Sequence, residues 1–279
     1  MRLITWNLNR ATWQQRGHCK SADEHQRRAW EELGALGVDV AFLQEAMPPP
    51  LELSRPPLAT LPAGVEREDW RSLPGPSRWW CSALATWTRD LAPFPTEADA
   101  LEPLDETHKG AYRLGQVPFG DGRLIVASIY ALWDYAGLRK GEKPRYSETS
   151  LHRTLSDLTP IIDVHRTAFS VVVAGDFNAS TQFGRPDREP YGLIHARLRS
   201  LGLVNVTVST SDDRLENCIC ADDPCEHVRS LEGPTPYQDD YIYASPDIAE
   251  RTTRVTVERS PGIEAVSDHF PLVVEVEPT

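Results

Sequence analysis

The chain has 279 residues, 40% of them hydrophobic, which is enough to bury a large core in one big two-layer domain or in two ordinary ones. Its net charge of −12 argues against a protein that binds duplex DNA through a broad basic face, because such binding depends on neutralising phosphates with Lys and Arg. A local basic patch, or carboxylates gathered around a divalent ion, is compatible with this charge.

The start of the chain and its cysteines indicate a compartment. The first residues, Met1 to Trp6, resemble a strand and lack the charged leader and long apolar stretch of a secretory signal. No run approaches the roughly 18 consecutive apolar residues of a membrane span. The five cysteines are an odd number spread over a large chain, unlike a disulfide framework. We therefore expect a cytoplasmic protein that does not bind membranes, with cysteines that are reduced or bind metal.

The first 45 residues predict a strand, a helix and a second strand. Strand patterns at 2–9 and 38–45 flank a helical pattern at 21–36. Ser21 and Glu24 form a capping box, which predicts that the helix begins there.

The middle of the chain continues to alternate strands and helices. A proline-rich segment at 47–62 follows neither period and is expected to be a surface loop. Pro160 is expected to kink or end the helix in which it lies. The predicted strands are 83–89, 124–132 and 170–177, and the predicted helices are 149–165 and about 191–201.

The last third of the chain is rich in strands. Short predicted strands cover 203–208, 241–244, 254–258 and 272–276. The chain shows no tandem repeat, low-complexity tract or break in composition. Many strands with a few interspersed helices predict a single domain of two packed sheets flanked by helices.

Six short polar signatures lie at the ends of predicted strands, five after a strand and one before it. Each alone has an ordinary structural explanation, such as a turn, a solvated strand end or a helix cap. Side chains at strand ends can, however, converge on one rim of a sheet, where open sheets commonly bind ligands. The signatures are Trp6-Asn7-Leu8-Asn9, Leu43-Gln44-Glu45, Ser128-Ile129-Tyr130, Gly175-Asp176-Phe177-Asn178, Ser267-Asp268-His269 and, before its strand, Asp239-Asp240-Tyr241.

In this order, the six signatures resemble those of the endonuclease/exonuclease/phosphatase superfamily, which includes exonuclease III, the abasic-site endonucleases and deoxyribonuclease I. The resemblance extends from Asn7 to His269, and Gly-Asp-Phe-Asn and the late Ser-Asp-His are its most specific parts. It implies an α/β fold in which residues 1–279 form a single domain. That fold is a four-layer α-β-β-α sandwich with two central, mostly antiparallel sheets and the site at one edge.

The resemblance implies a divalent metal ion at that edge. Similarity to the family assigns Glu45 as the principal ligand, with Asn7 and Asp268 as further ligands or close partners. Oxygen ligands of this kind suit Mg²⁺, with Mn²⁺ as a substitute. The ion would neutralise an anionic phosphate ester and assist the attacking water.

The resemblance also implies the catalytic groups. Asp176 matches the residue that orients or deprotonates the attacking water, and Asn178 matches the amide that positions this water and steadies the phosphate. Tyr130 matches a position that contacts the phosphate or the leaving group. His269, held in its tautomer and orientation by Asp240, would donate a hydrogen bond or a proton to a phosphate oxygen.

Aromatic and basic residues near the signatures are candidate substrate contacts. Trp133 and Arg145 follow Tyr130 on a predicted loop, and Arg185 and Arg188 follow Gly-Asp-Phe-Asn. Such residues contact the phosphate backbone and stack on bases in nucleic-acid complexes. A solvated loop explains the same pattern, so both interpretations stay open.

A second cluster of possible metal ligands lies in a predicted loop insertion near 217–236. Cys218, Cys220, Cys225 and His227 place four soft ligands within ten residues. Their number fits a closed structural zinc site. Their spacing is tighter than that of common zinc motifs, and the superfamily pattern contains no such element, so free thiols in a long loop are the alternative.

We expect a Mg²⁺-dependent phosphoesterase that hydrolyses phosphodiester bonds, most simply a nuclease acting on DNA. The alternative is a phosphatase or phosphodiesterase acting on a small-molecule or lipid-derived phosphate, which the acidic composition suits. A binding protein on a degenerate catalytic scaffold is disfavoured because Glu45, Asp176, Asp268 and His269 are all present. The sequence gives no indication of an obligate protein partner.

Overall fold

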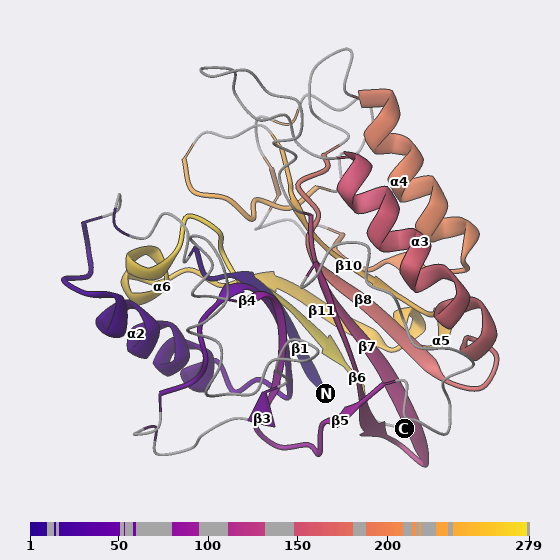
Figure 1. Ribbon diagram of the computed structural model, residues 1–279, viewed down its shortest axis with the longest axis horizontal. Helices are drawn as coiled ribbons and strands as arrows, with labels where there is room; N and C mark the ends of the chain where they lie inside the picture. Colours follow the sequence, from indigo (N-terminus) through magenta and orange to yellow (C-terminus); the bar gives the residue numbers. More distant parts are fainter. Residues whose placement is uncertain are drawn as a thin grey trace.

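Two six-stranded β-sheets packed face to face form the centre of the computed structural model, and helices cover their outer faces (Figure 1). This arrangement confirms the expected four-layer sandwich. The structure describes residues 1–9, 14, 17–50, 53, 58–59, 80–94, 111–131, 148–180, 188–208, 214–215, 218, 227–233 and 237–277.

The first sheet has the strand order β11-β12-β1-β2-β4-β3. Its strands are antiparallel to their neighbours except for β1 and β2, which run parallel and are joined through helix α2 (Ala22–Ala35). The first and last strands of the chain, β1 and β12, are thus neighbours in the interior of the sheet. The bounds are β1 Arg2–Asn7, β2 Val40–Ala46, β3 Leu58–Ala59, β4 Trp80–Thr86, β11 Thr252–Val257 and β12 Leu272–Val276.

The second sheet has the strand order β5-β6-β7-β8-β10-β9. Here β7 and β8 form the parallel pair, joined through helix α3 (Glu148–His165), and the other described pairs are antiparallel. The two sheets are thus mostly antiparallel, as expected. The bounds are β5 Ala92–Pro93, β6 Tyr112–Phe119, β7 Gly122–Tyr130, β8 Ser170–Asp176, β9 Val204–Asn205 and β10 Asp240–Ala244.

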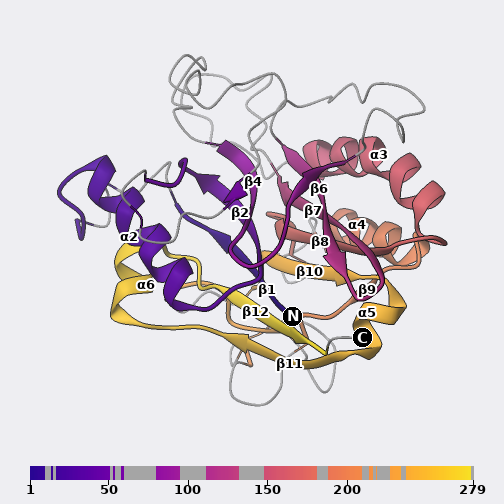
Figure 2. The same ribbon diagram turned by 90° about the horizontal axis from the view of Figure 1, so that it is seen from below.

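The helices form the two outer layers. Helices α2 and α6 (Pro261–Val266) lie against the first sheet, and α3 and α4 (Arg188–Ser200) lie against the second (Figures 1 and 2). The short helix α5 (Pro246–Glu250) follows β10 directly. Among the described residues, no helix combines the length and apolar character that a bilayer-crossing segment needs.

The central strands are buried on both faces, which explains their continuous apolar sequences. In β8, Val172 and Ala174 join the core that contains β1 and β2, whereas Val171 and Val173 join the core beneath α3 and α4. Alternate side chains of one strand point to opposite faces of the sheet. A strand that is covered on both sides therefore loses the polar alternation of a half-exposed strand.

Helix α2 begins where its capping box predicts. The Ser21 hydroxyl oxygen accepts a hydrogen bond from the Glu24 backbone N–H at 3.1 Å, and the Glu24 carboxylate accepts one from the Lys20 backbone N–H at 2.7 Å. In a standard capping box, the glutamate accepts from the backbone N–H of the N-cap residue itself. Here it accepts from Lys20, the residue before the N-cap. Trp30 and Leu33 are buried beneath the helix, which fixes its inner face.

Helix α3 confirms the predicted helix over 149–165, since it continues through Pro160 to His165, and Ile161 and Ile162 are buried in the core beneath it. Their burial offsets the loss of one backbone hydrogen bond at proline. The strand expected at 203–208 is reduced to the two residues of β9.

Five elements were not expected: the two-residue strands β3 and β5, strand β6, and helices α5 and α6. Strand β3 lies within the expected loop at 47–62. Strand β6 contains Gly115 and Pro118, both unfavourable in strands. A Cβ atom at Gly115 would lie 2.9 Å from Leu91 Cδ1, so glycine permits close packing there. Helices α5 and α6 are very short, although each starts with a Ser N-cap followed by Pro, a recognisable signal.

His195 of α4 is a buried structural residue in the core beneath the helices. Its Nε2 lies 3.1 Å from the Ala179 carbonyl oxygen and therefore donates to it, which leaves Nδ1 to accept from the Tyr243 hydroxyl at 2.7 Å. Burial lowers the pKa of His195 from 6.5 to about 4. The folded protein therefore holds this ring in its neutral form at neutral pH.

The neutral His195 predicts a loss of stability in acid. Because the pKa is lower in the folded than in the unfolded chain, the unfolded chain takes up the proton first as the pH falls from about 6.5 towards 4. This residue should remove up to about 3 kcal/mol from the free energy of unfolding. In urea titrations at about pH 7 and about pH 4.5, His195→Gln should lose less stability than the wild type.

The exposed His18 offers a matched control. His18→Gln should show the full acid loss of the wild type. An equal loss in wild type and His195→Gln would show that His195 does not contribute to it.

Candidate active site

Polar side chains gather where the two parallel strand pairs end. Asn7 ends β1 and Glu45 is the penultimate residue of β2, while Tyr130 and Asp176 end β7 and β8 opposite each other. Asp240 begins β10 in register with Asp176. The expected convergence of strand ends on one edge is therefore what the structure shows for these five residues.

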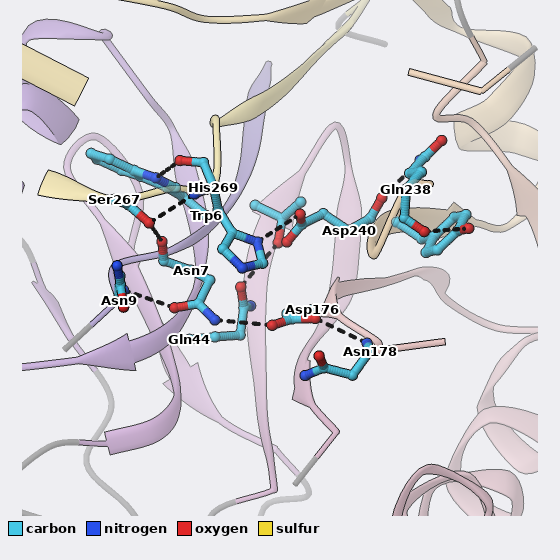
Figure 3. Close-up of polar contacts among 12 residues, drawn as sticks. Trp6, Asn7, Asn9, Gln44, Asp176, Asn178, Gln238, Asp240, Ser267 and His269 are labelled. Carbon is cyan, nitrogen blue, oxygen red and sulfur yellow. Dashed lines mark hydrogen bonds and ion pairs between the residues drawn. The ribbon is translucent and has the colours of Figure 1, made fainter. Parts of the chain in front are cut away.

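Two hydrogen bonds join the sheets at this edge. Asn7 Nδ2 donates to Asp176 Oδ2 at 2.9 Å (Figure 3), and the Tyr130 hydroxyl donates to Glu45 Oε1 at 2.8 Å. In each bond, one partner belongs to the first sheet and the other to the second. All four residues are buried. The arrangement of the site and the packing of the two sheets are thus set by the same contacts.

The backbone takes a left-handed turn at three of these strand ends. Asn9, Glu45 and Asn178 have φ angles of 52°, 48° and 45° and are the non-glycine residues with positive φ among those described. Asparagine adopts this conformation readily, whereas glutamate does so at a cost. Such strain in a non-glycine residue is concentrated at functional sites in proteins.

Two of these turns also fix polar side chains. The backbone N–H of Asn9 donates to Asn7 Oδ1 at 2.8 Å, and the backbone N–H of Asn178 donates to Asp176 Oδ1 at 2.9 Å (Figure 3). Each side chain thus binds the backbone two residues further along, as Asx turns do. Asp176 is held through both of its carboxylate oxygens.

His269 is held by contacts on its ring and on its backbone. Its Nδ1 lies 2.9 Å from Asp240 Oδ2, and Asp240 is 1% exposed (Figure 3). Its carbonyl oxygen accepts a hydrogen bond from Trp6 Nε1 at 2.8 Å. The ring Nε2 makes no hydrogen bond with residues that the structure describes. The pair matches the expected arrangement of a histidine oriented by an aspartate.

Burial is the main influence on the pKa values of the acids at this site. The pKa of Asp176 is raised from 3.8 to about 7, mainly by burial and also by Asp240, against the opposing effects of His269 and of the hydrogen bonds from Asn7 and Asn178. Burial opposes a charge on His269, but Asp240, together with Asp176 and Asp268, outweighs it and raises the pKa of His269 well above 6.5. A carboxylate with a pKa near 7 suits a group that takes up a proton at neutral pH.

The signature Ser267-Asp268-His269 lies elsewhere in the fold than expected. It follows helix α6 and precedes β12, and so does not end a strand. Its backbone pairs with a neighbouring segment: Leu231 forms a β-bridge with His269, and the Glu232 N–H donates to the Asp268 carbonyl oxygen at 2.7 Å. Asp268 is partly exposed beside His269.

Ser267 is a structural residue of the site to which the sequence assigned no role. It is fully buried, its hydroxyl donates to the Asn7 carbonyl oxygen at 2.6 Å, and it accepts from the His269 N–H at 3.0 Å (Figure 3). It therefore links the end of β1 to the segment that carries the histidine. Its place in the Ser-Asp-His signature was the only signal in the sequence.

Asp239 is a second such residue. It is 4% exposed, and its Oδ1 has no hydrogen-bond partner among the described residues. Burial raises its pKa well above 3.8, and the neighbouring Asp176 and Asp240 raise it further. The doublet of aspartates in the sequence indicated an additional acid but not its burial.

Of the residues predicted to bind substrate, Arg188 is described and is the first residue of α4. Other predicted residues lie outside the described part of the chain. Most of the predicted loop insertion near 217–236 is also outside the described residues. The predicted residues in this group are Trp133, Arg145, Arg185, Cys220 and Cys225.

The fit of the site to a divalent cation rests on its buried carboxylates. Asp239 and Asp240 each have a buried Oδ1 without a hydrogen-bond donor among the described residues. Buried carboxylates in proteins are either paired or bound to metal. Among these same residues, no three Cys, His, Asp or Glu side chains form a metal-binding cluster. That is compatible with Mg²⁺, which uses one or two carboxylates and keeps several waters.

Residues 4–269 match the model of the endonuclease/exonuclease/phosphatase family, and the chain belongs to this family. Its members are hydrolases that act on phosphate esters and generally use divalent metal ions. A comparison with curated protein sequences finds no match.

Solved structures show the same fold across the whole chain. An AP endonuclease from Archaeoglobus fulgidus is 17% identical with a TM-score of 0.54, covering 99% of each chain. The endonuclease domain of TRAS1, a telomere-specific non-LTR retrotransposon, is 14% identical with a TM-score of 0.55, covering 99% of this chain and 97% of that one. The 3′-5′ exonuclease NExo from Neisseria meningitidis is 16% identical with a TM-score of 0.55, covering 99% and 100%.

The buried hydroxyl of Ser267 predicts a measurable contribution to stability. Ser267→Ala leaves the Asn7 carbonyl oxygen and the His269 N–H without this partner. We expect the free energy of unfolding, measured by urea titration, to fall by about 1–3 kcal/mol. Ser200→Ala removes an exposed hydroxyl that bonds to the Arg197 carbonyl oxygen and should change it by less than about 0.5 kcal/mol. Equal effects in the two variants would contradict the structural role of Ser267.

Proposed function

We propose that this protein is a Mg²⁺-dependent nuclease that hydrolyses phosphodiester bonds in DNA. The observation that best supports this function is the grouping of side chains where the strand ends of the two sheets meet. There, Asp176 is bonded to Asn7 and lies beside the Asp240–His269 pair. Proteins of similar fold are named as an AP endonuclease, a retrotransposon endonuclease and a 3′-5′ exonuclease. We place the protein in the cytoplasm, with DNA as its main partner and no obligate protein partner.

In this proposal, Glu45, Asn7 and Asp268 hold the Mg²⁺ ion. Bound there, the ion supplies charge neutralisation to the phosphate and to the leaving oxygen. Tyr130 binds Glu45 through its hydroxyl and so keeps the carboxylate oriented. Asp268 is partly exposed and directly precedes His269.

Asp176 takes the proton from the attacking water. Its pKa of about 7 allows it to accept a proton at neutral pH, and its two oxygens are fixed by Asn7 and by the Asn178 backbone. The Asn178 side-chain amide donates to the Ala131 carbonyl oxygen at 3.2 Å, which orients its own oxygen. We assign that amide to positioning the water and the phosphate.

His269 acts on the phosphate from its second ring nitrogen. Because Nδ1 donates to Asp240 and the pKa of the ring is raised, Nε2 also carries a proton at neutral pH. That N–H donates to a phosphate oxygen as negative charge develops on it. Water thus adds to phosphorus, Asp176 receives its proton, and the bond to the leaving oxygen breaks.

Substrate binding is assigned to Trp133, Arg145, Arg185 and Arg188, as the sequence suggests. A second candidate function is hydrolysis of phosphomonoesters. It is favoured by the net charge of −12 and by a similar structure, 16% identical with a TM-score of 0.54, of the 3′ phosphatase NExo from Neisseria bound to a product DNA hairpin.

A panel of substrates tests the proposed reaction. The purified protein is assayed with Mg²⁺, with Mn²⁺ and with a chelator on single- and double-stranded DNA, RNA, abasic-site DNA and simple phosphomonoesters. We expect DNA cleavage that the chelator abolishes and that added Mg²⁺ or Mn²⁺ restores. Hydrolysis of monoesters alone would favour the phosphatase, and full activity in the chelator would contradict the metal dependence.

Substitutions test the assigned roles. Asp176→Asn and His269→Ala should each lower kcat by at least about 100-fold, because each removes a proton-transfer or charge-stabilising group. Their far-UV circular dichroism should match that of the wild type. Asp163→Asn, which changes an exposed aspartate of α3 paired with Arg166, should keep full activity. Near-normal turnover in either site variant would remove that residue from the mechanism.

A further inference from the structure

The side chain of Gln238 forms hydrogen bonds with three segments of the chain. It is fully buried and lies on the far side of Asp240 from His269 (Figure 3). Its Oε1 accepts a hydrogen bond from the Val228 backbone N–H at 2.9 Å. Its Nε2 donates to the Asp240 carbonyl oxygen at 2.8 Å and to Thr207 Oγ1 at 3.4 Å. One amide group thus joins the start of β10 to two neighbouring segments.

These partners define the orientation of the amide. The Val228 N–H can only donate and the Asp240 carbonyl can only accept, so the oxygen and nitrogen of the amide cannot exchange places. A buried backbone group that loses its partner is costly, so both contacts favour this one arrangement. The Gln238 carbonyl oxygen accepts from the Tyr241 hydroxyl at 2.9 Å, which holds the backbone of the residue in place.

The segment that begins at Val228 holds the backbone of His269. Leu231 forms a β-bridge with His269. The Phe270 N–H donates to the Ser230 carbonyl oxygen at 2.6 Å. Two contacts therefore keep the histidine and the residue after it against this segment.

The start of the same segment is also held. Arg214 and Val228 form an antiparallel bridge, and the Leu215 N–H donates to the His227 carbonyl oxygen at 2.9 Å. Cys218 Sγ lies 3.6 Å from His227 Nδ1, as in a thiol–imidazole contact. The backbone to which the amide binds is therefore fixed on both sides.

These contacts form a closed ring. From Gln238, one path leads through Val228 and its segment to His269, and the other leads through the Asp240 backbone to the Asp240 carboxylate. The contact of 2.9 Å between His269 Nδ1 and Asp240 Oδ2 closes the ring. We propose that Gln238 is a positioning residue that sets the separation of Asp240 and His269, an inference that rests on the proposed hydrolysis, in which this pair acts.

The separation matters because His269 acts on the phosphate through its second ring nitrogen. Hydrogen bonds weaken steeply when their distance and angle depart from the preferred values. A displacement of about 1 Å in a catalytic group can lower turnover by about 100-fold. Gln238 acts on the pair through backbone groups, so its replacement should change kcat and leave KM largely unchanged.

Steady-state kinetics on DNA with Mg²⁺ test the proposal. Gln238→Met keeps the approximate size of the side chain and removes the amide. We expect kcat to fall by about 10- to 100-fold, with KM within about threefold of the wild type.

Ser245→Ala is the matched control. The buried Ser245 hydroxyl accepts from the Val171 N–H at 3.0 Å, just beyond the other end of β10. This variant should also lower the midpoint of urea unfolding but keep the wild-type kcat. Equal losses of kcat in the two variants, or none in Gln238→Met, would overturn the proposal.

Crystal structures give a test that does not need activity. In Gln238→Met, the distance between His269 Nδ1 and Asp240 Oδ2 should exceed about 3.5 Å, whereas Ser245→Ala should keep the 2.9 Å of the wild type. A retained short distance in Gln238→Met would overturn the proposal. A wild type that cleaves no DNA, with the pair displaced in Gln238→Met, would contradict the proposed function and support the positioning role.

Gln238→Asn replaces Gln238→Met if the latter does not fold. It keeps a neutral amide but is shorter by one methylene, about 1.5 Å, so it loses at least one of the two backbone contacts. We expect a smaller fall in kcat, of at least about threefold, and a longer distance within the pair. The wild-type kcat together with the wild-type distance would overturn the proposal.

Discussion

The hydrogen bond between Asn7 and Asp176 is the contact on which the rest of the site depends. Both residues are buried, at 3% and 1% exposure, and they come from different sheets. A buried polar group that loses its partner costs roughly 1–3 kcal/mol, so the sheets are held in the one packing that satisfies this pair. The bond between Tyr130 and Glu45 acts in the same way across the same gap. The positions of the site residues therefore depend on how the two sheets pack against each other.

The architecture explains why these residues meet. Each sheet contains one parallel pair of strands joined by a helix, β1-α2-β2 in the first and β7-α3-β8 in the second. In each unit, the first strand ends in a neutral hydrogen-bonding residue, Asn7 or Tyr130, and the second carries an acid at its end, Glu45 or Asp176. Carboxyl ends of parallel strands are common ligand sites in α/β proteins. Here the strand ends of the two units lie next to each other, and each unit contributes one half of the site.

The sequence predicted those parts of the molecule that depend on local patterns. The apolar runs of β2 and β8 and the cap at Ser21 identify their elements because each signal is contained in a few residues. Strand β6 was missed because Gly115 is favoured only by the packing of side chains from elsewhere in the chain. The six signatures predicted the family, which is confirmed, and supplied the acids and amides that we propose for the site. The bonds between them, the burial of Asp239 and the role of Ser267 depend on contacts between distant segments, which local patterns do not contain.

At Glu45, the positive φ angle favours a residue such as glycine, whereas the proposed chemistry needs a carboxylate. Glycine or asparagine would relieve the local conformational cost, so random substitution selected for folding alone would tend to remove this carboxylate. The proposed role of Glu45 as a metal ligand gives a reason for a glutamate at a position where the backbone favours glycine or asparagine.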